Sequence, residues 1–210
     1  MSGLCCMEKV IHYSLLTFIL LVFLGCGSDR QVDEITDPED GLARGWQEYA
    51  SGNYESAILS FESVLNMDSQ PETMSDAHNG LGWSYACISG DAGVNKVNVG
   101  VALEKFQIAL DEDAANSDAW VGMASMLVVR RNSDDDLDKA IACIDKSLDG
   151  NADYLYRHDY DSEADLYALR AQCYYFLGNI DGAKTEIDRC LEIDKQNQSA
   201  MALMTIFQMD

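Results

Sequence analysis

One residue pattern recurs four times along the chain and restricts its possible folds more than any other feature. In each copy an alanine is followed by phenylalanine or isoleucine four residues later and by leucine eight residues later. The copies begin at Ala57, Ala102, Ala140 and Ala183. Positions spaced in this way share one face of an α-helix, so each copy predicts a helix with one buried face. The chain has only two prolines and no long alternating β-branched runs, which favours an all-α fold.

A partner helix is expected before each of these four segments. Three of the preceding segments carry a large residue, a small residue four positions later and a second large residue three positions beyond it. They are His78, Gly82 and Tyr85; Trp120, Ala124 and Leu127; and Tyr167, Ala171 and Tyr174. The first copy is less regular, because Gly45 is the small residue but Tyr49 lies one position late. Small residues let paired helices approach closely, while the larger side chains fill the space beside them.

Hairpins with this pattern resemble the tetratricopeptide repeat, a 34-residue helix-turn-helix unit with a W-x2-L-G-x2-Y and A-x3-F signature. The resemblance covers residues 38–210 and implies a right-handed superhelical stack of four hairpins with a C-terminal capping helix. The expected repeats lie near 38–71, 75–115, 117–150 and 164–197, with the cap at 199–210. Gly52 and Gly178 stand where a first helix should end, and we expect both to adopt a left-handed conformation.

The repeats are longer than the family unit. Their alanines lie 45, 38 and 43 residues apart, from 57 to 102, 102 to 140 and 140 to 183. We expect loops to take up the additional residues. The candidate loops are 89–100 in the second hairpin, 131–136 in the third and 150–162 before the fourth.

The N-terminus has the layout of a signal peptide. A charged pair, Glu8 and Lys9, precedes the apolar run from Leu15 to Leu24, which is about half as long as the ~20 residues of a membrane span. The run ends in Phe23-Leu24-Gly25-Cys26, which resembles the lipobox of bacterial lipoproteins, although phenylalanine replaces the usual leucine. The resemblance implies a diacylated Cys26 as the new N-terminus. The alternative is a plain secretory signal with an incidental cysteine.

This interpretation divides the chain into a signal peptide at 1–25, a lipidated tether at 26–37 and a folded domain at 38–210. Met7 is a more natural start than Met1, since lipoprotein signals begin close to their charged region. A residue other than aspartate after the lipidated cysteine is compatible with outer-membrane sorting in this class. We therefore expect an acyl-anchored envelope protein, on the periplasmic face of an outer membrane.

The charge balance excludes one class of partner. The chain has 36 acidic and 14 basic residues and a formal charge of -22. Such a surface repels phosphate backbones over roughly 10 Å at moderate salt, so nucleic acid is not an expected partner.

No catalytic, metal or cofactor site is apparent in the sequence. The segment from His158 to Glu163 lacks the spacing of a zinc site and is interpreted as a solvated acidic loop. The acidic strings at 111–113 and 134–136 lack the glycine and terminal glutamate of a calcium loop. Cys173 and Cys190 lie on paired helices, where they act either as buried small hydrophobic residues or as a disulfide.

In tetratricopeptide stacks the first helices line a concave groove that receives a segment of a partner. The resemblance implies groove positions that are aromatic at both ends and apolar in the middle. They are Leu42, Trp46, Tyr49, Asn79, Trp83, Ala86, Val121, Ser125, Val128, Ala168, Gln172 and Tyr175. Trp46 and Trp83 fit stack packing as well as they fit recognition.

The charges near the groove indicate which ligands it accepts. The expected first-turn residues of the first helices are acidic: Glu39, Asp76, Asp118 and Asp165. A basic or apolar-aromatic segment is therefore the expected ligand. The favoured function is a lipid-anchored scaffold for envelope proteins. The alternative is a glycan-binding or small-ligand accessory protein of an envelope enzyme. A catalytic function would need a nucleophile-base pair or a metal cluster, and the sequence shows neither.

Overall fold

The computed structural model describes residues 35–67, 69–88, 92–150, 155, 158–160 and 162–207, with the side chains of 92–97 excepted. The expected signal peptide, Cys26 and most of the expected tether lie outside these residues. None of the described helices is long and apolar enough to cross a membrane.

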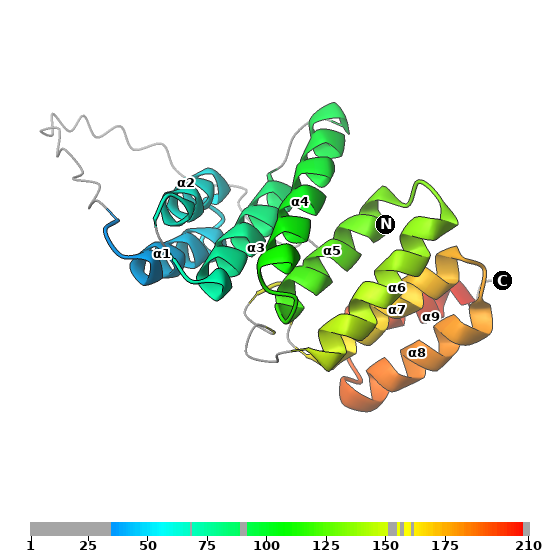
Figure 1. Cartoon of the computed structure of the whole chain (residues 1–210). Helices are drawn as coiled ribbons and strands as arrows, with labels where there is room; N and C mark the ends of the chain where they lie inside the picture. Colours follow the sequence, from blue (N-terminus) through cyan, green and yellow to red (C-terminus); the bar gives the residue numbers. More distant parts are fainter. Residues whose placement is uncertain are drawn as a thin grey trace, which may run out of the picture.

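The described residues form nine helices that confirm the all-α expectation. Their bounds are α1 Pro38–Ala50, α2 Tyr54–Leu65, α3 Pro71–Cys87, α4 Ala92–Glu112, α5 Ser117–Arg130, α6 Asp134–Asp149, α7 Glu163–Phe176, α8 Ile180–Ile193 and α9 Gln198–Phe207. Consecutive helices pair into four hairpins, and these follow one another along the molecule with α9 packed on the last (Figure 1). The four expected hairpins and the terminal helix are therefore present.

Glycine ends the first helix in the first and fourth hairpins. Gly52 has φ 77° and Gly178 has φ 74°, both in the left-handed region that a side chain disfavours. The backbone N–H of each glycine donates to a carbonyl three residues back, at Tyr49 and at Tyr175. The expected conformation is confirmed, and it gives these two hairpins the same tight turn.

The recurring phenylalanines wedge between small residues of neighbouring first helices. Phe61 of α2 is fully buried, and its ring fills the space that a Cβ on Gly45 of α1 or on Gly80 of α3 would need. Phe106 of α4 occupies the same place between Gly82 of α3 and Gly122 of α5. Each phenylalanine therefore joins two consecutive hairpins, which is how an alternation of large and small residues builds a repeat stack.

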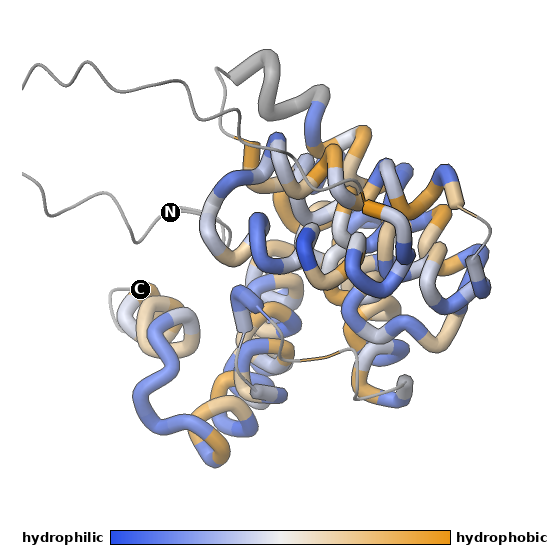
Figure 2. The backbone as a smooth tube through the Cα atoms, turned by 90° about the vertical axis from the view of Figure 1, so that its left-hand side faces the viewer, coloured by the Kyte–Doolittle hydropathy of each residue, from blue (hydrophilic) through white to orange (hydrophobic). Residues whose placement is uncertain are grey.

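The buried side chains form two clusters. The larger extends from α1 to α7 and includes both phenylalanines, and the smaller joins α7, α8 and α9 through residues such as Ala168, Ile187 and Leu203. Figure 2 shows hydrophobic and hydrophilic residues alternating along the helices, as expected for helices that bury one face. α7 therefore contributes to both clusters, and α9 closes the smaller one at the C-terminal end.

Two of the three expected loops are wrong. The second hairpin's extra residues lengthen α4, which begins at Ala92 rather than after Gly100. α4 is the longest of the described helices, and it packs against α3, the 17-residue helix before it. In the third hairpin only 131–133 connect the helices, because Asp134 to Asp136 form the first turn of α6, where negative charge is favourable. The expected connection before the fourth hairpin is present between α6 and α7.

The two cysteines with alternative interpretations are buried free thiols. Neither Cys173 of α7 nor Cys190 of α8 forms a disulfide in the structure. Burial raises the pKa of Cys173 to about 12 and that of Cys190 to about 11. Both residues therefore act as small hydrophobic side chains.

Candidate functional site: an occupied face of the first helices

The first helices of the first three hairpins present one continuous face, because α1 contacts α3 and α3 contacts α5. We call it the first-helix face and define it by five side chains. They are Trp46 and Tyr49 of α1, Asn79 and Trp83 of α3, and Asp118 of α5. Asn79 and Asp118 are fully buried, and Nδ2 of Asn79 donates to the carboxylate of Asp118 over 2.7 Å. The face is therefore aromatic with a buried carboxylate at its centre.

A residue from outside the hairpins fills the centre of this face. His158 lies in the connection between α6 and α7, and its side chain is only 6% exposed. Its ring stacks on Trp46, with centroids 5.1 Å apart and planes 17° apart. Tyr49 and Trp83 meet the same ring edge-on, at 5.1 Å and 4.7 Å between centroids. Three aromatic side chains of the first-helix face thus enclose one imidazole, and the ring of Tyr160 meets it edge-on as well, at 5.7 Å between centroids.

Both ring nitrogens of His158 contact carboxylates. Nε2 lies 3.0 Å from Oδ2 of Asp118, and Nδ1 lies 3.0 Å from Oδ2 of Asp159. A neutral imidazole has only one donor, so two carboxylate partners favour the doubly protonated cation. Burial alone would lower the pKa of His158, but the charge of Asp118 and the hydrogen bonds to both carboxylates raise it to about 9. The imidazole is therefore charged at neutral pH.

Two tyrosine hydroxyls also donate to these carboxylates. The hydroxyl of Tyr160 donates to Oδ1 of Asp118, and that of Tyr49 donates to Asp159. Both tyrosines are about 5% exposed. Burial, followed by the charge of Asp159, raises the pKa of Tyr49 well above its usual range, which keeps it a neutral donor.

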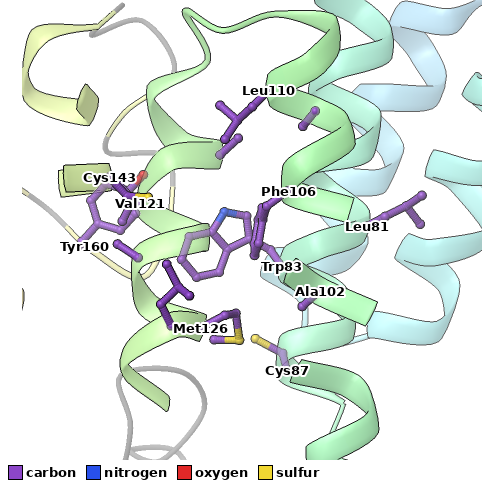
Figure 3. Close-up of a cluster of buried hydrophobic side chains, with 14 of the residues drawn as sticks. Leu81, Trp83, Cys87, Ala102, Phe106, Leu110, Val121, Met126, Cys143 and Tyr160 are labelled. Carbon is purple, nitrogen blue, oxygen red and sulfur yellow. The ribbon is translucent and has the colours of Figure 1, made fainter. Parts of the chain in front are cut away.

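Tyr160 also contributes to the packing around Trp83. Figure 3 labels Trp83 among Phe106, Val121 and Tyr160. The ring centroids of Trp83 and Phe106 lie 5.5 Å apart, and those of Trp83 and Tyr160 lie 6.4 Å apart. Trp83 therefore connects the core of the stack to the residues that cover the first-helix face.

Two polar atoms on this face have no hydrogen-bond partner in the described part of the chain. They are Nε1 of Trp83, on a side chain that is 3% exposed, and Oδ1 of the fully buried Asn79. Both residues belong to α3, four positions apart, and so they share one side of that helix. By contrast, Nε1 of Trp46 has an acceptor, Asp76, at 3.3 Å. A donor and an acceptor thus remain unsatisfied next to the aromatic enclosure.

The structure brings only some of the predicted groove residues together. Trp46, Tyr49, Asn79 and Trp83 surround or adjoin His158, whereas the others are spread over the stack. Four of them belong to the larger cluster or pack against it: Val121, Val128, Leu42 and Ala86. Two belong to the smaller cluster, Ala168 and Tyr175. The remaining two, Ser125 of α5 and Gln172 of α7, are half-buried. The four that meet at His158 form the candidate site.

The first-turn positions need one correction. Glu39, Asp118 and Asp165 lie in first turns, as expected. Asp76 does not, because α3 begins at Pro71 and places Asp76 in its second turn.

The interpretation of 158–163 as a solvated acidic loop is wrong. His158 and Tyr160 are buried, and Glu163 is the first residue of α7. The sequence hid these site residues because their partners lie 40 to 42 positions away on α5. The one available signal was the long spacing from Ala140 to Ala183, which left residues over for the connection.

The arrangement suits binding better than catalysis. A general base needs a nitrogen that can accept a proton, and both nitrogens of His158 already face carboxylates. Within the described residues, no three His, Cys, Asp or Glu side chains come together in a way that could hold a metal ion. What the face does is to hold a short polypeptide stretch by stacking, charge and hydrogen bonds.

The fold defines a class, the helical-hairpin repeat proteins. The tetratricopeptide repeat family matches residues 164–197, which span the fourth hairpin. Together with the four hairpins, this match identifies the chain as a tetratricopeptide repeat protein. No curated protein matches the sequence.

Two solved structures are similar to the fold. YrrB, a TPR protein with an unusual peptide-binding site, is 17% identical, with a TM-score of 0.55 over 80% of this chain and 74% of that one. TTC0263, a thermophilic TPR protein in Thermus thermophilus, is 16% identical, with a TM-score of 0.48 over 83% of this chain and 100% of that one. At this identity YrrB supports the fold alone.

Proposed function

We propose that the protein is a lipid-anchored adaptor of the cell envelope that binds a segment of another protein on its first-helix face. The tetratricopeptide fold suggests a protein-interaction scaffold. The observation that carries the proposal is the first-helix face itself. It already holds a polypeptide stretch, His158 to Tyr160, by means that do not depend on that stretch being part of the same chain.

The envelope part of this proposal rests on the sequence. Cys26 follows an apolar run in a lipobox-like context and is the proposed acyl attachment site. Intact mass and membrane partition of the protein, expressed in a bacterium, test it against Cys26→Ser. We expect the wild type to begin at a diacylated Cys26 and to remain with outer membranes, and the variant to be released. A wild-type protein without acyl groups would remove the anchor from the proposal.

An adaptor role is favoured over the glycan-binding alternative. The buried carboxylate of Asp118 pairs with the imidazole of His158, and a neutral sugar has no cation to replace it, whereas a polypeptide side chain does. We also infer a non-catalytic role, which is typical of tetratricopeptide scaffolds. YrrB, whose fold is similar, has an unusual peptide-binding site, and this is compatible with peptide binding on the same fold.

Site-specific photo-crosslinking in cells tests partner binding. A photoreactive residue at Leu42, one turn before Trp46 on α1, should capture a discrete polypeptide. The matched control is Leu59 of α2, which is 68% exposed and equally apolar. Equal capture at both positions, or none at Leu42, would contradict the proposed use of the first-helix face.

A further inference from the structure

The stretch from His158 to Tyr160 has the chemistry that the first-helix face selects. The centre of the face is an acidic and aromatic enclosure, and the stretch brings a planar cation followed two residues later by an aromatic hydroxyl. Asp118, which is fully buried on α5, receives Nε2 of His158 on one oxygen and the hydroxyl of Tyr160 on the other. One carboxylate therefore organises both side chains.

Among the residues that the structure describes, the charged and titratable groups around His158 come from three helices and from the stretch itself. They are Tyr49 of α1, Asp76 of α3, Asp118 of α5, and Asp159 and Tyr160 of the stretch. Asp76 is linked to the site through its hydrogen bond with Trp46. The carboxylates are the anions of this set, and His158 is the cation among them. An acidic ligand would meet repulsion at every side, whereas a cation would replace His158 without loss of charge balance.

The backbone of Asp159 permits this arrangement. Its φ of 47° lies in the left-handed region, which aspartate tolerates better than most residues. The residues on either side, His158 and Tyr160, both contact Asp118, so the chain makes a tight bend at Asp159. Neither adjoining hairpin supplies this bend, which belongs to the connection between α6 and α7.

The stretch does not satisfy the whole face. Nε1 of Trp83 and Oδ1 of Asn79 are buried without a partner in the described residues, one a donor and the other an acceptor. An unsatisfied buried polar group is costly to the fold, and a peptide backbone offers the complementary carbonyl and N–H. A longer polypeptide segment would therefore gain contacts that the resident stretch lacks.

We infer that His158 to Tyr160 is an internal stand-in for the partner, and that the partner presents a planar cationic side chain close to an aromatic one. This inference rests on the proposed function, because it assigns the ligand class of the same face. Arginine fits best in a partner, because its guanidinium stacks on Trp46 and pairs in two-point geometry with Asp118. Binding requires displacement of the stand-in. The apparent affinity therefore equals the intrinsic affinity multiplied by the fraction of molecules in which the face is open.

A peptide with the sequence of residues 155–162 provides a direct probe. Labelled with a fluorophore, it should bind the full-length double variant His158→Ala/Tyr160→Ala at least about tenfold more tightly than the wild type, measured by fluorescence anisotropy. The control peptide carries alanine at the positions of His158 and Tyr160 and should lose this binding. His158→Arg is the matched protein control, since it refills the face with a planar cation and should bind the probe as weakly as the wild type.

Equal binding of the probe to the wild type and to the double variant, or binding to neither, would overturn the inference. If the double variant loses its helical circular dichroism, His158→Gln replaces it, because it removes the charge and keeps a polar side chain of similar length. At least about a threefold gain is then expected, and no gain would again overturn the inference. Capture of a partner at Leu42 together with failure of the probe would refute the stand-in and leave the adaptor proposal standing. Failure of both would refute both.

Discussion

The fourth repeat and the first three repeats are stabilised by different means. The fourth matches the 34-residue family unit, begins with a capping box at Ser162, and buries Arg170 against Glu186. The first three are longer, depend on Phe61 and Phe106 wedged between glycines, and share a buried histidine that no hairpin contributes. The regular repeat therefore has its own ion pair and cap in addition to its contacts with the preceding repeat, whereas the irregular repeats share a buried residue of the connection that follows them.

This difference indicates where the chain is specialised. A repeat that needs only its neighbours can follow the family pattern closely, because every contact recurs with the repeat. Within the described residues, the first-helix face of the irregular repeats has two buried polar atoms without a hydrogen-bond partner, which stability alone does not favour. Features that cost stability concentrate at functional sites, so the irregular repeats are the ones that we expect to bind.

Removal of a wedge should have the largest effect and should separate the two regions. Phe106→Ala deletes a fully buried ring between α3 and α5, and we expect a loss of about 3 to 5 kcal/mol in the free energy of unfolding. Hydrogen exchange should accelerate in α3 to α6 and much less in α8 and α9, since Ile187 and Leu203 belong to the smaller cluster. Denaturant unfolding gives the total loss.

The control for the wedge is Leu59→Ala, on a side chain that is 68% exposed, with an expected change within about 0.5 kcal/mol. Uniform acceleration of hydrogen exchange from α1 to α9 in Phe106→Ala would mean that the two clusters unfold as one. The comparison between the repeats would then lose its physical basis.

The charge on His158 should make the stability of the irregular repeats dependent on pH. The pKa of His158 in the folded protein, about 9, lies above its ordinary value of 6.5. Its contribution is therefore complete below pH 6.5 and is lost as the pH rises through 9, by up to roughly 3 kcal/mol. Urea unfolding at a series of pH values should show this loss in the wild type, and His158→Gln should flatten it.

Hydrogen exchange localises the same effect. Raising the pH from about 7 to about 9.5 should reduce protection in α1, α3 and α5 more than in α8, after correction for the intrinsic exchange rate. An unchanged difference between the wild type and His158→Gln across this pH range would show that His158 does not carry a buried charge.

The ion pair of the regular repeat should have a smaller effect. Nε and Nη2 of Arg170 donate to Oε2 of Glu186 at 2.9 Å and 2.7 Å, and Nη1 donates to Asp145 of the preceding repeat. Arg170→Met leaves Glu186 buried with only Arg189, 3.0 Å away, as its partner, so we expect a loss of about 2 kcal/mol by denaturant unfolding. Arg170→Met/Glu186→Met should recover most of it, and a double variant as unstable as the single one would refute this explanation.

The sequence predicted the parts of the molecule that depend on local spacing. Alanine followed by phenylalanine or isoleucine located the second helix of each hairpin, and Gly52 and Gly178 marked two turns, because a helix face and a left-handed turn are properties of a few consecutive residues. Trp46 and Trp83 were found as candidates, but packing and recognition could not be separated. In the structure each contacts both a core phenylalanine and His158.

The parts that depend on distant contacts were not predicted. Tyr49 and Asp159 meet across 110 positions of sequence, and no local pattern encodes that contact. An acidic connection is ordinarily solvated, and only its encounter with Asp118 and three aromatic rings makes burial of His158 favourable. The start of α4 was missed because the glycine and β-branched residues between Ala92 and Gly100 do not favour a helix.

The two glycine turns provide the smallest effect and the sharpest control on the comparison. Gly52 and Gly178 have φ values of 77° and 74°, and a Cβ would meet no atom within 4 Å at either position. Alanine there costs only the strain of a left-handed backbone, about 1 kcal/mol in each case. Because the turns are the same, Gly52→Ala and Gly178→Ala should lower the free energy of unfolding equally. Unequal losses of unfolding free energy would show that the first and fourth repeats differ within the hairpin itself. Equal losses would show that they differ only in the contacts between hairpins.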